Sequence, residues 1–230
     1  MTLSKKDYNT YQNILKSGLT NLKLDIEFPY QEMYNEIEPF FDNFVTHRAK
    51  YSNDGWKSLV LHGTGVYDTT STKTQNQWEK GSSLNWTTMA DLCEVAYNFF
   101  DKIWPQTKHK RIRWMLLEPG GKIFPHKDSN DYMLGDAVNF SLNQPNDCDF
   151  ILGGEKIPWK AGEARLLNLS HIHSVENNST ERRVHMIYHG HDIRCNRLGE
   201  WSQKNKPFNL EETDEEFIKL VNRSYAKVAL

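Results

Sequence analysis

A histidine and an aspartate lie two positions apart at the end of a predicted strand, in the stretch Phe124–Asp128. Alternate residues of an extended chain point to the same side, so His126 and Asp128 face one volume. An imidazole nitrogen and a carboxylate oxygen can then both approach one cation, at about 2.0–2.2 Å from each. This spacing predicts two ligands of a metal site.

A third ligand must come from a distant part of the chain. His173 stands at a predicted strand end, 47 positions after His126 (173 − 126). Two histidines and one carboxylate leave three adjacent coordination positions open, as in non-haem Fe(II) oxygenases. Nitrogen and oxygen ligands without thiolate also favour Fe(II) over a structural zinc site, which a fourth ligand would close. His171 shares a face of this extended segment with His173 and is the alternative third ligand.

Arg183 follows His173 by ten positions (183 − 173), across the turn-forming stretch Asn177–Thr180. If this turn joins two adjacent antiparallel strands, Arg183 lies near His173 and points into the same cavity. A 2-oxo acid that chelates the metal through two open positions needs a cation for its far carboxylate. The planar guanidinium of arginine binds a carboxylate through two hydrogen bonds, which lysine does not. We therefore predict that Arg183 binds such a cosubstrate, with His185 on the same strand face and Arg182 on the opposite one.

Short strands separated by turn-forming residues must position these side chains. Their spacing of about ten residues favours a sandwich or barrel over βαβ units. Glu118–Gly121, with proline second and glycine third, predicts a type II turn. The candidate strands are Ile112–Leu117, Lys122–Pro125, Ala137–Leu142, Cys148–Leu152, Ala164–Leu169 and Arg183–Tyr188.

Helical segments flank the strand-rich region on both sides. Apolar residues at helical spacing predict a helix over Tyr30–Val45 with a break at Pro39, and a second helix over Thr87–Trp104. A strand within Ser58–Val66 lies between them, and a capping box at Thr213–Glu216 predicts a further helix.

The 230 residues are enough for one domain with a substantial core. We expect a helical N-terminal flank over 1–54, a β core over 55–190 and a C-terminal extension with a helix over 191–230. The segment Ser129–Gly135 and the flanking helices are expected to shape a substrate pocket.

Composition argues against several classes of partner. The formal net charge of −2 gives no electrostatic signature of nucleic-acid or anionic-membrane binding, and the basic cluster Lys108–Arg113 predicts only a solvated strand end. Three widely spaced cysteines favour a reducing compartment over a disulfide framework. No stretch approaches the ~20 apolar residues of a membrane span, and the first residues lack the apolar run of a signal peptide. We therefore expect a cytoplasmic protein; its oligomeric state stays open.

At these residues the sequence resembles the aspartyl/asparaginyl β-hydroxylase family of 2-oxoglutarate oxygenases, and especially the branch of the free-proline cis-hydroxylases. The resemblance covers residues 55–190. The matching pieces are Glu118-Pro119-Gly120-Gly121-x-x-x-Pro125-His126-x-Asp128, Gly162-Glu163, His173-Ser174-Val175-x-Asn177 and Arg183-Val184-His185, with a weaker match at Trp56-Lys57.

The resemblance implies a mainly β protein with flanking helices and a double-stranded β-helix core of the jelly-roll or cupin type. It implies Fe(II) held by His126, Asp128 and His173, with 2-oxoglutarate clamped by Arg183. The implied reaction uses O2 to hydroxylate an amino acid, or an amino-acid side chain of a peptide or protein, with succinate and CO2 as co-products. Because Asp128 is kept, hydroxylation is favoured over halogenation, in which that position is vacated for halide.

Two positions depart from the family pattern. Where members often carry a histidine on the strand after the first ligand, this chain has Asn139, and an arginine two positions earlier in some members is Ala137 here. Both positions help to hold the 2-oxo acid or the substrate in the family. We expect Asn139 and His185 to contact the cosubstrate or substrate, while the substrate itself does not follow from the sequence.

Two other classes of function fit part of the pattern. A non-catalytic β-helix module would use the His/Asp cluster as a structural or vestigial metal site, and it would form no succinate from 2-oxoglutarate. A metal-dependent hydrolase or isomerase on a cupin-like barrel would act without O2, although the sequence offers no second carboxylate near the ligands.

Overall fold

The computed structural model describes residues 19–68, 84–103, 109–128, 137–169 and 171–190, together with Arg223 and Lys227. The strands are β1 (Asn21–Lys23), β2 (Val45–Thr46), β3 (Trp56–Gly63), β4 (Asn85–Trp86), β5 (His109–Leu117), β6 (Lys122–His126), β7 (Ala137–Ser141), β8 (Cys148–Leu152), β9 (Glu155–Lys156), β10 (Ala164–Leu167), β11 (His173–Asn177) and β12 (Arg183–Gly190). The helices are α2 (Tyr30–Ile37), α4 (Met89–Leu92) and α5 (Glu94–Ile103), with the 3-10 helices η1 (Glu38–Asn43) and η2 (Ala49–Tyr51).

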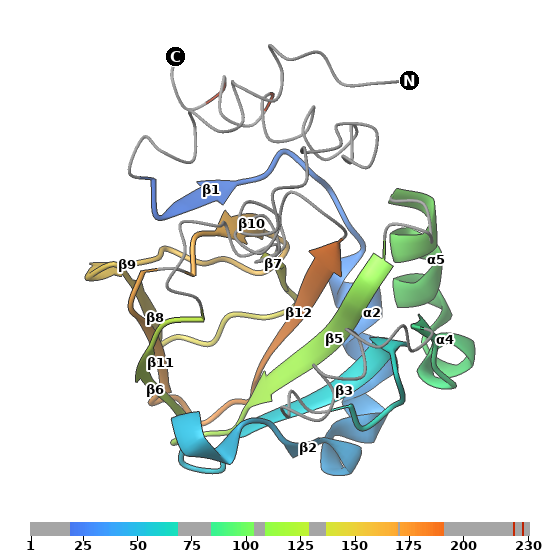
Figure 1. Cartoon of the computed structure of the whole chain (residues 1–230), viewed down its shortest axis with the longest axis horizontal. Helices are drawn as coiled ribbons and strands as arrows, with labels where there is room; N and C mark the ends of the chain where they lie inside the picture. The colour runs from blue at the N-terminus through green and yellow to red at the C-terminus, as the bar shows by residue number, and fades with distance from the viewer. Residues whose placement is uncertain are drawn as a thin grey trace, which may run out of the picture.

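The described strands form two antiparallel sheets. The larger sheet has the order β1-β10-β7-β12-β5-β3-β2, with β4 paired to β3, and the smaller has the order β6-β11-β8-β9. Figure 1 shows the smaller sheet on one side of the larger sheet, and α2, α4 and α5 on its other side. This arrangement confirms the mainly β fold with flanking helices and a double-stranded β-helix core. The segment expected to be a helical flank also supplies β1 and β2, which lie at the two ends of the larger sheet.

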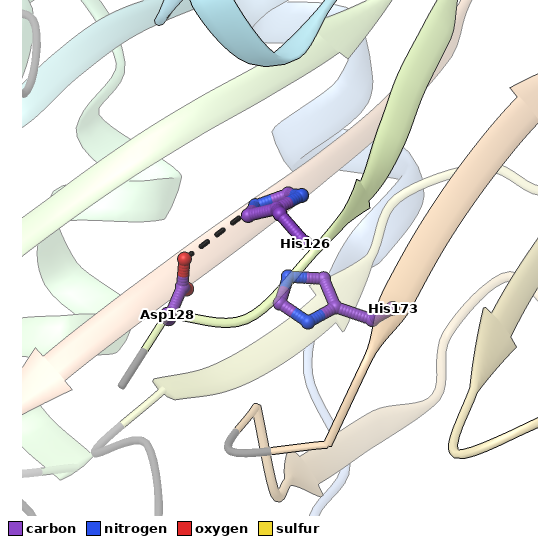
Figure 2. A group of neighbouring side chains, drawn as sticks. All are labelled: His126, Asp128 and His173. Carbon is purple, nitrogen blue, oxygen red and sulfur yellow. Dashed lines mark ion pairs between the residues drawn. The ribbon is translucent and has the colours of Figure 1, made fainter. Parts of the chain in front are cut away.

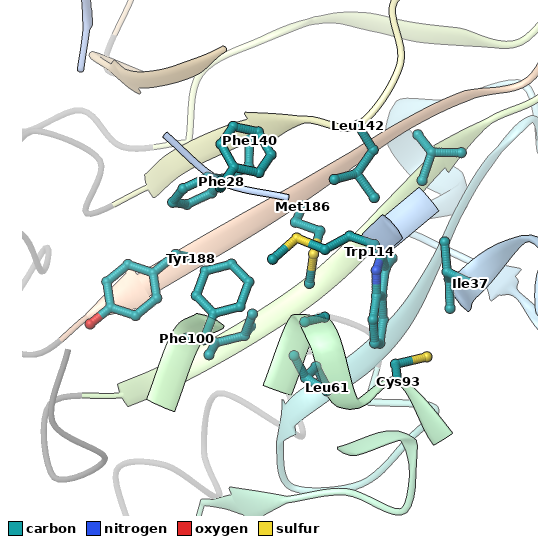
Figure 3. Close-up of a cluster of buried hydrophobic side chains, with 14 of the residues drawn as sticks. Phe28, Ile37, Leu61, Cys93, Phe100, Trp114, Phe140, Leu142, Met186 and Tyr188 are labelled. Atoms are coloured by element: carbon teal, nitrogen blue, oxygen red, sulfur yellow. The ribbon is translucent and has the colours of Figure 1, made fainter. Parts of the chain in front are cut away.

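Successive residues of β12 divide between the two faces of the larger sheet. Met186 and Tyr188 are fully buried in the apolar cluster under the helices, where the ring of Tyr188 stacks on that of Phe100 (Figure 3). Burying such side chains contributes roughly 1.5–3 kcal/mol each. Arg183 and His185 point the other way, into the space between the sheets. The alternation along one strand thus separates the apolar core from the polar cavity.

The helices follow the predicted pattern except at one break. α2 ends at Ile37 and continues as η1, so the expected interruption near Pro39 is confirmed. The single helix predicted from Thr87 is wrong, because α4 and α5 are separated at Cys93 (φ −128°, ψ 67°). The carboxylate of Glu36 accepts hydrogen bonds from the backbone N–H groups of the next residues, Val95 (2.7 Å) and Ala96 (3.2 Å). These bonds satisfy free N–H groups at the start of α5, so a new helix can begin there.

The predicted pairing of the strands that carry His173 and Arg183 is also wrong. β11 pairs with β6 and β8, whereas β12 pairs with β5 and β7, so the turn after Asn177 carries the chain from one sheet to the other. The Asn177 side chain donates hydrogen bonds to the carbonyls of Leu117, Glu118 and Glu181, which holds this crossing against the end of β5.

The turn between β5 and β6 is the other crossing at this end. Gly120 has φ +71° and Gly121 N–H donates to the Glu118 carbonyl at 2.8 Å, which confirms the predicted type II turn. The N–H of Gly120 donates to Asn177 O at 2.8 Å, and the N–H of Asn177 donates to Gly121 O at 3.0 Å. The β5–β6 turn and the segment after β11 are therefore hydrogen-bonded to each other, and together they hold the two sheets at a fixed separation.

The basic cluster at the start of β5 is a further correction. Arg111 and Arg113 are 1% and 5% exposed, rather than solvated. Both alternate along β5 with Ile112 and Trp114, which belong to the apolar cluster under the helices. Arg111 and Arg113 therefore lie on the other face of the sheet, toward the smaller sheet. The predicted helix at Thr213–Glu216 and the segment Ser129–Gly135 lie outside the described residues. In the described part of the chain, no helix has the length and apolarity to cross a membrane.

Candidate functional site

His126, Asp128 and His173 come together at one end of the space between the sheets. His126 is the last residue of β6, His173 is the first of β11, and the two are paired across these strands. Their ring centroids lie 4.3 Å apart, and one ligand atom from each of the three residues lies within 4.8 Å of the others. Figure 2 shows Asp128 just after the strand, turned back toward the His126 ring. Both histidines are buried, while 34% of the Asp128 side chain is exposed.

Backbone carbonyls set which ring nitrogen of each histidine is free. Nδ1 of His126 lies 2.7 Å from Phe124 O, and Nδ1 of His173 lies 3.1 Å from His171 O. A carbonyl only accepts, so each Nδ1 carries the proton and each Nε2 keeps its lone pair. Nε2 of His126 is buried 3.5 Å from Asp128 Oδ1, and no described residue forms a hydrogen bond with it. This donor set fits a divalent metal. The backbone carbonyl of His171 orients the ring of His173, and the ring of His171 is not part of the cluster.

The pKa values of these groups favour their metal-binding forms. Burial acts to raise the pKa of Asp128, but His126, His173 and Arg48 beside the carboxylate hold it below its usual range. Burial lowers the pKa of His173, more than the carboxylate of Asp128 raises it. Metal ligands must be deprotonated to bind, so the carboxylate and the imidazole are both ready at neutral pH.

A cavity extends from this cluster between the two sheets. It has a volume of about 60 Å³, and both sheets line it. Its polar lining includes Asn139, Arg183 and His185 beside the cluster. The apolar lining is Trp56, Met115, Ile123, Phe150, Leu167, Leu169, Val175 and Ile187. The mostly apolar wall leaves these few polar groups to orient a ligand.

Arg183 is a buried cation for which the described part of the chain supplies no anionic partner. It is 5% exposed, its Nε lies 3.4 Å from Gln144 Oε1, and its Nη2 lies 2.9 Å from His185 Nδ1. Among the described residues no carboxylate forms a salt bridge with it. Burial lowers its pKa to about 10, which still leaves the guanidinium charged at neutral pH. A buried charge is costly unless it is paired, so this site is suited to the carboxylate of a bound ligand.

His185 presents a hydrogen-bond donor to the same cavity. The guanidinium of Arg183 can only donate, so Nδ1 of His185 accepts and the ring proton lies on Nε2. This Nε2 and Nδ2 of Asn139 are both buried, and neither has a hydrogen-bond partner among the described residues. Trp159 packs edge-on against the ring of His185, with the centroids 4.8 Å apart, and fixes its plane. Two unsatisfied donors thus line the cavity together with Arg183.

The neutral His185 predicts a pH dependence of stability. Burial, and then the charge of Arg183, lowers its pKa well below 6.5. Below about pH 6.5 the unfolded chain therefore takes up a proton that the folded protein does not, and the free energy of unfolding falls by up to about 1.4 kcal/mol per pH unit. Urea unfolding of metal-free protein at pH 7.5 and 5.5 measures this loss. His185→Gln should lose less stability on acidification, and an equal loss in both proteins would contradict the assignment.

The sequence did not single out several residues around the site. Tyr51 stacks on the ring of His126 with centroids 4.8 Å apart, and Arg48 lies 3.3 Å from Asp128. Gln144 accepts a hydrogen bond from Arg183, and Trp159 packs against the ring of His185. These four side chains come from loops or short elements, where no periodic pattern shows which way a residue points.

Comparison with known proteins places the chain in a family. The model of the family described as aspartyl/asparaginyl beta-hydroxylase matches residues 25–191. No curated protein sequence matches the chain.

Several solved structures are similar to this chain at low sequence identity. A viral collagen prolyl hydroxylase from Paramecium bursaria Chlorella virus-1, in complex with 2OG, is 12% identical; the match covers 75% of this chain and 96% of that one, with a TM-score of 0.42. A prolyl-4-hydroxylase from Pseudomonas putida is 14% identical (77% and 96% covered, TM-score 0.44). A prolyl hydroxylase from Trichoplax adhaerens, bound to a peptide of hypoxia inducible factor, is 11% identical (84% and 96% covered, TM-score 0.45).

The family match spans most of the chain and includes every residue of the cluster and the cavity described above. The chain belongs to the aspartyl/asparaginyl β-hydroxylase family and is an oxygenase that uses Fe(II) and 2-oxoglutarate.

Proposed function

We propose that this oxygenase hydroxylates an amino acid, free or as a side chain of a peptide or protein, and releases succinate and CO2. The observation that carries the proposal is the buried guanidinium of Arg183. It has no carboxylate partner among the described residues and shares one cavity with His126, Asp128 and His173. A cation at one end and three metal ligands at the other suit a 2-oxo diacid, which chelates through one end and carries a carboxylate at the other.

In this proposal His126, Asp128 and His173 hold Fe(II). The bound metal supplies the chelation of the 2-oxo acid and the activation of O2. The protein supplies the ligands and their orientation. The two Nδ1–H···O=C hydrogen bonds fix the imidazole planes, and the apolar wall limits the access of water. The side of the cluster at Asp128 is the most exposed and offers the approach for substrate.

Arg183, His185 and Asn139 bind 2-oxoglutarate in this proposal. Arg183 pairs with the far carboxylate, and the Nε2–H of His185 and the Nδ2–H of Asn139 donate to its oxygens. Three hydrogen-bond donors in one part of the cavity match an anion. Asn139 stands where family members often carry a histidine, and its amide keeps a donor there.

The role of Asn139 can be tested with a pair of variants of similar size. Asn139→Leu removes the donor and should weaken 2-oxoglutarate binding by roughly 1–2 kcal/mol. Asn139→Asp places a negative charge beside the cosubstrate carboxylate and should weaken binding further. Calorimetric titration of 2-oxoglutarate into Mn(II)-loaded protein without O2 measures both. Equal affinity in all three proteins would show that Asn139 faces another part of the ligand.

The family, whose name specifies aspartyl and asparaginyl side chains, and the resemblance to free-proline hydroxylases support this choice of substrate class. The direct test supplies Fe(II), ascorbate, 2-oxoglutarate and O2 with free proline, aspartate and asparagine, and with peptides that contain them. Succinate should form in proportion to a product heavier by one oxygen atom. An Asp128→Ala protein is the control, because any succinate that it forms comes from iron that is not bound at this site. Lack of succinate with every substrate would instead support the non-catalytic binding module.

A further inference from the structure

The segment 47–53 lies against the metal cluster, and both of its ends are fixed. At its start, His47 is 2% exposed, with its Nδ1 3.0 Å from Ser58 Oγ. At its end, the side chain of Asn53 accepts from the N–H of Lys122 at 2.7 Å and donates to Gly120 O at 3.0 Å. Between these points the chain forms η2. The segment therefore has a defined position beside β6, although it precedes β6 by some 70 residues in sequence (122 − 53 = 69).

Two side chains of this segment contact the metal ligands at and just beyond the end of β6. The ring of Tyr51 stacks on that of His126 at 4.8 Å and 23°. Arg48 Nη1 lies 3.3 Å from Asp128 Oδ1, and within the described chain this is the single side-chain bond of Arg48. Arg48 also has left-handed backbone angles (φ 47°, ψ 62°), which a non-glycine residue rarely adopts. Strain of this kind persists where the surrounding structure requires it, often at functional sites.

Asp128 needs an external partner to hold its carboxylate. It lies beyond the end of β6, where its N–H donates to Leu169 O at 3.1 Å, and a third of its side chain is exposed. The two histidines, by contrast, have their rings fixed by backbone carbonyls. Among the described residues, the ion pair with Arg48 is the interaction that orients this carboxylate, apart from the contact with His126.

We propose that Arg48 is a positioning residue, which holds the carboxylate of Asp128 in the orientation that binds the metal. The proposal rests on the metal centre of the proposed function. A partner of this kind, hydrogen-bonded to a ligand and not to the metal, changes metal affinity by roughly 10- to 100-fold when it is removed.

The charge of Arg48 makes the proposal sharply testable. A cation beside a divalent metal repels it, so if charge alone mattered, removing Arg48 would tighten metal binding. If Arg48 positions Asp128, removing it weakens metal binding despite the lost repulsion. The two effects have opposite signs. Lys50 is a matched control, because it is an exposed cation on the same short helix and contacts the ring of Tyr51 rather than a carboxylate ligand.

The experiment measures Mn(II) affinity of the full-length protein by electron paramagnetic resonance of the free ion. Arg48→Met should bind Mn(II) about 10- to 100-fold more weakly than wild type. Arg48→Lys should recover part of that loss, because it restores the charge without the planar fork. Lys50→Met should bind Mn(II) as wild type does, or slightly more tightly.

Equal or tighter Mn(II) binding by Arg48→Met would overturn the positioning role and leave the metal centre intact. Failure of the wild type to bind Mn(II) would overturn the proposed function and this inference with it. Arg48→Gly separates affinity from folding, because glycine accepts the left-handed backbone without strain. It should lose the same affinity as Arg48→Met while the melting temperature of the metal-free protein does not fall. A fall in both would mark Arg48 as merely structural.

Discussion

Replacing Arg183 by methionine is expected to weaken 2-oxoglutarate binding by roughly 2–5 kcal/mol, on the order of 30-fold to several thousand-fold in Kd. The reason is that a buried carboxylate of the cosubstrate would lose its cation in a cavity walled mainly by apolar side chains. Arg183→Lys should give an intermediate loss, since a point charge replaces the bidentate fork. Calorimetric titration of the Mn(II)-loaded protein without O2 measures the three affinities.

The neighbouring arginine supplies the control. Arg182 lies on the opposite face of the strand, where it pairs with Glu118 at 2.8 Å and Asp42 at 3.3 Å. Arg182→Met removes the same charge without touching the cavity and should leave 2-oxoglutarate affinity unchanged. The metal-free Arg183→Met protein should unfold no more easily than wild type, because the buried guanidinium lacks a carboxylate partner among the described residues. Loss of affinity in Arg182→Met and not in Arg183→Met would contradict this assignment.

His173→Ala is expected to abolish specific metal binding, with a loss larger than the roughly 100-fold that removal of a supporting residue causes. It removes one of three protein ligands and leaves too few to hold the ion. His171→Ala should bind the metal almost as wild type does. His171 contributes its backbone carbonyl to Nδ1 of His173, and alanine keeps that carbonyl. Mn(II) affinity and the decay of 2-oxoglutarate without substrate are the two measurements.

This pair of variants decides between the two candidate ligands. If metal binding survived His173→Ala and was lost in His171→Ala, the third ligand would be His171. Circular dichroism of both metal-free proteins checks that neither change alters the fold. Added imidazole should partly restore Mn(II) binding to His173→Ala, since the vacated position lies in a cavity, and should have no effect on His171→Ala.

Much of this site was predictable because it depends on local geometry. The two-residue spacing of His126 and Asp128, and the alternation that puts Arg183 and His185 on one face of β12, are properties of any extended chain. Most strand boundaries agree with the turn residues between them to within a few positions, because proline, glycine and asparagine interrupt pairing locally. The approach of segment 47–53 to β6 was not predictable, because it depends on contacts between residues far apart in the sequence.

The sequence alone therefore determined the reaction class, through residue types and short spacings that select a metal and an anion. The spacings left open which histidine is the third ligand and which strand carries Arg183 to the cavity, and these questions depend on the tertiary structure. Alternation cannot separate His171 from His173, since both fall on one face of an extended chain; the pairing of His173 with His126 across two strands favours His173 as the ligand. Likewise, Arg183 reaches the cavity from the larger sheet, whereas His173 lies in the smaller sheet. The direction of a side chain along a strand is a local property that the sequence reveals, whereas the pairing of strands depends on the whole chain.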